Sequence, residues 1–151
     1  MTQTLATLLI AHVILGLIGI GALWALLMAL LKKMPSIRFL RASSLVAVIG
    51  FILSWISGGY YYVMYYGGPV KAAIKAGPNP WAHAFFMEAK EHVFLLLPFI
   101  SIALACAFFF GGERIVGDDK KRRILFAIAL IAALIGVFST LSGVIISGSV
   151  R

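Results

Sequence analysis

Four long apolar runs constrain the fold of this chain more than any other feature. They cover about residues 5–31, 40–66, 80–110 and 124–147. An α-helix needs about 20 apolar residues to cross the hydrocarbon core of a membrane. Backbone groups in lipid must bond to one another, and no short alternating strands of a β-barrel are visible. The sequence therefore predicts an all-α integral membrane four-helix bundle, with residues 1–151 forming one domain.

The composition excludes the other broad classes. Hydrophobic residues make up 62% of the chain and charged residues only 12%, whereas a soluble domain carries about 25% charged residues. The net charge of +8 does not indicate nucleic acid, because the basic residues flank the apolar runs and form no stripe on a polar face. The single cysteine, Cys106, lies inside an apolar run and excludes a disulfide within the chain.

The basic residues also predict an orientation. Loops 32–41 and 111–123 hold nine of the thirteen Lys and Arg residues. Cytoplasmic loops carry an excess of Lys and Arg. We therefore expect both loops to be cytoplasmic and both termini to lie on the non-cytoplasmic side, in a bacterial-type inner (plasma) membrane.

The positions of proline and glycine residues predict where the helices end or bend. We expect the second helix to end at residues 67–69, Gly-Gly-Pro. In the third, Asn79 is a suitable N-cap and Pro80 suits the first helical position. Pro98 has no backbone N–H, so a bend that frees the Phe94 carbonyl is predicted there.

A layer of polar side chains is predicted near one membrane boundary. Counting about 1.5 Å per residue from the basic loops puts His12, His92, Tyr60, Tyr61 and Ser142 at a similar depth. Ionisable residues close to the membrane are costly and mark a functional site by default. The other interpretation is a His–Glu contact that only holds the bundle together.

The faces of the helices divide these residues. At 100° per residue, Glu88 and His92 share one face of the third helix. His83 and Lys90 lie on the opposite side, so His83 and His92 are not expected to share a ligand. We expect the Lys90 side chain to extend outward, and Tyr61 to turn its hydroxyl toward the site.

Small residues lie on the same face as His12. Gly16 and Gly19 follow it at helical spacing. Such spacing usually indicates close helix packing in lipid, and beneath a histidine it also makes room for a flat macrocycle. The tyrosines of residues 60–66 and Trp81 are typical of an interfacial aromatic belt.

Two histidines on different helices can supply both axial ligands of a b-type haem. The sequence thus predicts a membrane redox protein that exchanges electrons with a quinone or an outer-side carrier. The sequence does not distinguish between a membrane oxidoreductase and an electron-transfer subunit. The predicted cofactor site comprises His12 and His92 as axial ligands, Glu88 orienting His92, Tyr61 as a hydrogen-bonding neighbour, and Gly16 and Gly19.

Two alternatives stay open. His12, His92 and Glu88 would also suit a mononuclear copper or zinc site, whereas a di-iron site fails because too few acids are present. The second alternative is a non-catalytic membrane subunit of a larger complex, or a homo-oligomer.

The chain also resembles a group of small four-helix membrane proteins. The residues that carry this resemblance are His12-Val13 followed by Gly16, Ser57-Gly58-Gly59, Lys90 and the basic run 120–123. The group includes the copper-resistance D proteins and the HemJ-type protoporphyrinogen oxidases. The resemblance implies a haem- or copper-linked redox role, with His12 and Lys90 at recurrent family positions. The acidic stretch 88–91 and the tyrosine cluster depart from the family pattern, so no specific activity is carried over.

Overall fold

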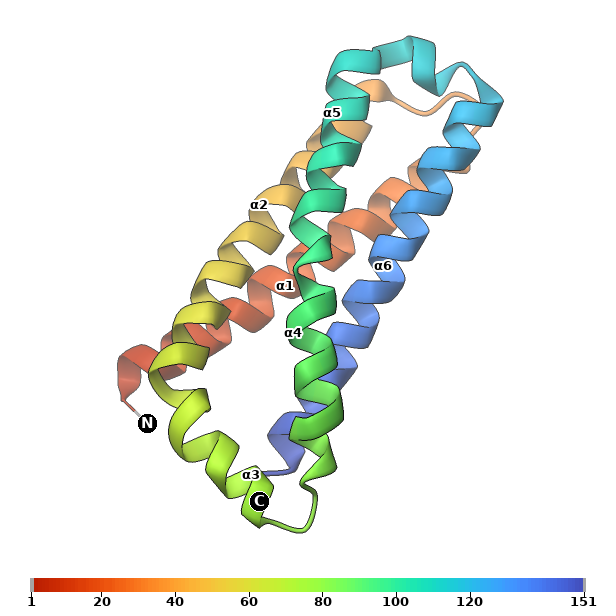
Figure 1. Ribbon diagram of the computed structural model, residues 1–151. Coiled ribbons are helices and arrows are strands. Elements are labelled where there is room, and N and C mark those ends of the chain that lie inside the picture. Colours follow the sequence, from red (N-terminus) through yellow and green to blue (C-terminus); the bar gives the residue numbers. More distant parts are fainter. Residues whose placement is uncertain (1, 151) are drawn as a thin grey trace.

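The protein folds into an elongated helical bundle. The computed structural model describes residues 2–150, and that part of the chain contains helices and no strand. Figure 1 shows both ends of the chain at one end of the bundle and the two short connections 31–36 and 117–118 at the other. In chain order the helices are α1 (Gln3–Leu30), α2 (Ile37–Tyr61), η1 (Tyr62–Val70), α3 (Lys71–Ala76), η2 (Ala82–Met87), α4 (Glu88–Phe94), α5 (Leu96–Val116) and α6 (Asp119–Gly148).

These elements join into four helical segments that are long and apolar enough to cross a membrane. The segments are Gln3–Leu30, Ile37–Ala76, Ala82–Val116 and Asp119–Gly148. They match the four apolar runs of the sequence to within two residues at Leu31 and at residues 80–81, so the all-α class and four long apolar helices are confirmed. Large hydrophobic side chains remain exposed along all four, as expected for surfaces that face lipid.

The predicted end of the second helix is wrong. Residues 67–69 do not stop it, and the helix continues to Ala76. Pro69 lies inside η1, a stretch of π-helix. The wider turn of a π-helix makes its hydrogen bonds from residue i to i+5, which leaves room for a proline ring that would clash with the preceding turn of an α-helix.

The third segment breaks where Pro98 predicts a bend. Helix α4 ends at Phe94, Leu95 forms a turn and α5 begins at Leu96. A second break lies at Gly112, whose φ of 54° is left-handed, so the straight part of α5 ends close to the predicted Phe110. The guanidinium of Arg41 donates to the carbonyl oxygens of Phe108 and Phe109 at 3.0 and 3.2 Å, and thereby satisfies acceptors at the helix end.

Helices α1 and α2 approach each other closely through glycines. A Cβ built on Gly50 would lie 2.9 Å from the Leu15 carbonyl oxygen and 3.0 Å from the Gly19 backbone nitrogen. A Cβ on Gly19 would lie 2.8 Å from the ring of Phe51. Gly19 therefore makes room for a neighbouring helix, which is the packing role that small residues usually have in membranes.

We predict that Gly50→Ala lowers the free energy of unfolding by about 1–3 kcal/mol, because the added methyl meets backbone that cannot move aside. Gly59 is the matched control on the same helix, since a Cβ there has no neighbour within 4 Å. Gly59→Ala should be neutral, or stabilising by up to about 1 kcal/mol through helix propensity. Reversible unfolding in mixed micelles measures both, and equal losses would contradict the close approach.

Candidate functional site

The imidazole of His12 is fixed by a hydrogen bond across the α1–α2 contact. Its Nδ1 lies 2.8 Å from the carbonyl oxygen of Ser54. A carbonyl oxygen only accepts, so Nδ1 carries the proton and donates. The hydroxyl of Ser54, 3.0 Å from Nδ1, donates to the backbone carbonyl of His12 at 2.9 Å. In the neutral ring, Nε2 is therefore left with a free lone pair.

Glycines make room for this arrangement. A Cβ on Gly58 would lie 2.7 Å from Cε1 and 2.9 Å from Cγ of His12, with no other group among its nearest neighbours. A Cβ on Gly16 would lie 3.2 Å from the hydroxyl oxygen of Ser54. The absence of a side chain at Gly16 thus leaves room for the hydroxyl of Ser54, the partner of His12. On its third side the imidazole meets Phe94 edge-on, with ring centroids 6.1 Å apart.

Lys90 extends into the bundle, which corrects the expectation that it extends outward. Its Nζ lies 3.5 Å from the position that a Cβ on Gly143 of α6 would occupy. Lys90 is also close enough to His12 for its charge to act on the ring. Lys90 and Phe94 are four residues apart on α4 and share a helix face. The side of α4 that meets His12 thus carries an ammonium group as well as an aromatic ring.

His92 does not join this group. Its ring is exposed, and Nδ1 donates to the Glu88 carbonyl oxygen at 2.7 Å, one turn back on α4. His92 precedes Phe94 by two residues, which places it about 160° around the helix from the side that meets His12. His92 is therefore on the side of α4 away from His12, and the two predicted axial ligands do not face each other. The partner of His92 on Glu88 is the backbone carbonyl, not the carboxylate as predicted.

The Glu88 carboxylate instead faces His83, a contact that the sequence analysis missed. Its Oε1 lies 3.5 Å from Nε2 of His83. The hydroxyl of Tyr66 lies 3.0 Å from Nδ1 of the same ring. In an α-helix, residues five apart in sequence lie about 140° apart around the helix axis. The sequence therefore predicted that His83 and Glu88 lie on different faces. Residues 82–87 form the π-helix η2, whose i to i+5 bonds bring such residues together.

Tyr61 lies among the tyrosines. It is half-buried, and its ring centroid lies 5.8 Å from that of Tyr65. The tyrosine hydroxyl that meets an imidazole belongs to Tyr66, which is buried and stacks on Tyr62 with ring centroids 5.3 Å apart. Part of the predicted aromatic belt is therefore an internal cluster.

The three-ligand metal site is not formed in the described part of the chain. No three His, Cys, Asp or Glu side chains among residues 2–150 lie together so that they could hold a metal ion. His12, His92 and Glu88 are thus not gathered around one point. His12 remains as a half-buried histidine whose Nδ1 is bonded across to α2 and whose ring meets Phe94 of α4.

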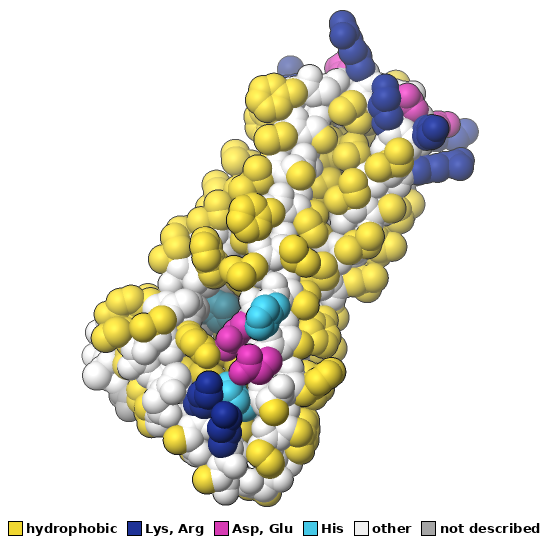
Figure 2. Space-filling view, viewed as in Figure 1, with side chains coloured by type: hydrophobic (Ala, Val, Ile, Leu, Met, Phe, Trp, Pro, Cys, Tyr) yellow, Lys and Arg dark blue, Asp and Glu magenta, His cyan; other side chains and the backbone are white. Residues whose placement is uncertain are grey.

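Polar side chains divide between the two ends of the molecule. Figure 2 shows His and acidic side chains together on the face around α4, with basic side chains beside them toward α3. The far end carries most of the Lys and Arg side chains. There Asp118 caps α6 by accepting from the backbone N–H groups of Lys121 and Lys120, and these bonds lower the pKa of its carboxyl.

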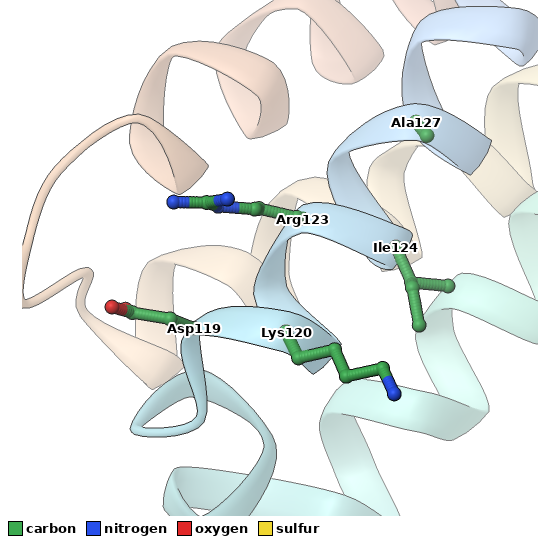
Figure 3. A pocket seen from close by; sticks show the side chains of 5 residues that line it. All are labelled: Asp119, Lys120, Arg123, Ile124 and Ala127. Atoms are coloured by element: carbon green, nitrogen blue, oxygen red, sulfur yellow. The ribbon is translucent and has the colours of Figure 1, made fainter.

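Two shallow hollows lie at this basic end. One of about 500 Å³ is lined by α6 alone, and its lining combines charged side chains with Ile124 and Ala127 (Figure 3). Another of about 460 Å³ lies between residues 34–38 and the end of α5. Both are open surface hollows far along the bundle from His12.

Comparison of the chain with protein-family models, with characterised proteins and with solved structures finds no match.

We predict that Gly58→Ala destabilises the protein by about 1–3 kcal/mol, because the methyl group would overlap the His12 ring. In the His12→Ala background the same change should cost much less, since the three nearest atoms to the added methyl all belong to the ring. A double-mutant cycle of unfolding free energies measures this coupling. Additive losses would show that the ring does not occupy that space.

Proposed function

We propose that this chain is an integral membrane redox protein that binds a b-type haem through Nε2 of His12. The observation that carries the proposal is the hydrogen bond from His12 Nδ1 to the Ser54 carbonyl. Histidines that ligate metals usually donate their other ring N–H to a carboxylate or a backbone carbonyl, which fixes the tautomer and the ring orientation. The donor chemistry of His12 therefore fits a haem iron, and imidazole is a common haem ligand.

Lys90 supports the same proposal. Its ammonium lies close enough to act on His12 and reaches toward Gly143. No acidic group within 4 Å of the ammonium neutralises it by an ion pair among residues 2–150. We propose that Lys90 binds a carboxylate of the ligand, because a half-buried cation stabilises an anion placed beside it. The bound haem would supply one-electron transfer by cycling of its iron.

We also propose an electron partner and a position of the site relative to the membrane. A quinone dissolved in the bilayer can reach a site between helices that are long and apolar enough to cross a membrane. The basic loops are at the opposite end of the bundle from the two chain termini (Figures 1 and 2), and His12 lies in the half of α1 nearer its N-terminus. If these loops are cytoplasmic, the proposed site lies near the outer face of an inner (plasma) membrane. An outer-side carrier is the other electron partner that we propose.

The proposal is tested by visible spectra of the protein purified from cells with ample haem, before and after reduction. We expect a Soret band in the wild type and loss of most of that band in His12→Gly, because the change removes the proposed imidazole ligand. Added imidazole should restore the band by entering the space of the lost side chain. His92→Ala is the matched control and should keep the full spectrum.

Two outcomes would overturn the proposal. Full haem occupancy in His12→Gly with an unchanged spectrum would exclude His12 as a ligand. A wild-type protein without haem would favour a non-catalytic membrane subunit or a copper or zinc protein, which elemental analysis would separate.

A further inference from the structure

A second group of titratable side chains lies apart from His12, around the buried ring of His83. His83 is only 1% exposed and Tyr66 only 4%. The side chain of Glu88 is 48% exposed. The three therefore form a line from a buried hydroxyl, through a buried imidazole, to a carboxylate that reaches the surface.

The two nitrogens of this ring differ in their surroundings. Nδ1 is held by the Tyr66 hydroxyl at 3.0 Å. Nε2 is buried, has no hydrogen-bond partner in good geometry, and faces Glu88 Oε1 at 3.5 Å. Buried polar atoms without a partner are uncommon and usually have a functional or catalytic explanation. Nε2 is thus the ring nitrogen that is placed to gain or lose a proton.

We propose that His83 and Glu88 form a proton-exchange site in which the buried imidazole takes up and releases a proton through the surface carboxylate. The proton on Nε2 passes to Glu88 Oε1, so that the imidazolium becomes a neutral ring protonated at Nδ1 and the carboxylate becomes a carboxylic acid. The acid then gives the proton to water and is again a carboxylate. Tyr66 accepts from Nδ1–H throughout and holds the ring in position.

The charges around His83 come from two elements, α3 and α4. Lys71 and Lys75 of α3 act on the ring as positive charges, and Glu91 of α4 acts as a negative one beside Glu88. Glu91 also acts on the Tyr66 hydroxyl, and its Oε1, like His83 Nε2, is a buried polar atom without a hydrogen-bond partner. Ligand binding at His12 is not required for this exchange, so the site stands independently of the proposed haem.

The test is the rate at which the His83 Nε2–H proton exchanges with water, measured by ¹⁵N NMR of the full chain in lipid nanodiscs. We expect Glu88→Gln to slow this exchange by about tenfold or more, because it removes the group that accepts the proton. His92 is an internal control, since its partner is the backbone carbonyl of Glu88. Unchanged His12 and His92 signals establish that the variant is folded.

Tyr66→Phe distinguishes the direction of exchange. It should shift the Nδ1 signal of His83 and leave the Nε2 exchange rate within about twofold of the wild type, because the path to Glu88 is intact. If Tyr66→Phe slows the exchange and Glu88→Gln does not, the proton leaves through the tyrosine and the proposal is wrong. Equal rates in the wild type and in Glu88→Gln would also overturn it.

Discussion

The hydrogen bond between the His12 ring and the Ser54 carbonyl is the interaction on which the candidate site depends. It requires α1 and α2 to approach so closely that only glycine fits at positions 50 and 58. It also uses the Ser54 hydroxyl to bond back to α1. The same contact therefore packs the bundle and selects the nitrogen of His12 that stays free. A polar side chain in a largely apolar molecule is in this way held in one orientation.

The sequence predicted the fold well where hydrophobicity alone decides it. The four apolar runs all became helices, and the Pro98 bend appeared because a missing N–H leaves the Phe94 carbonyl without its partner. The second helix was predicted to stop at residues 67–69 but continues to Ala76. Proline and glycine signals assume α-helical turns, whereas Pro69 lies in the π-helix η1.

The same reason limited the prediction of the site. His12 and its glycine face were found because α1 and α2 have regular 3.6-residue periodicity at that point. Glu88 was assigned to His92, whereas its carboxylate faces His83. The prediction assumed 100° of rotation per residue, which holds for an α-helix. Because η2 is a π-helix, this assumption assigns the residues that follow it to the wrong helix face. The dense run of aromatic and polar residues from Tyr60 to Tyr66 and from Trp81 to His92 was the available signal that this end is irregular.

The protonation of the two His12 ring nitrogens can be measured directly. ¹⁵N NMR of histidine-labelled protein in lipid, prepared without haem or added metal, reports which ring nitrogen carries the proton. The geometry predicts that the neutral His12 ring is protonated at Nδ1 and bare at Nε2. A ring protonated at Nε2 would contradict the bond to Ser54, and with it the reason for assigning His12 as a ligand.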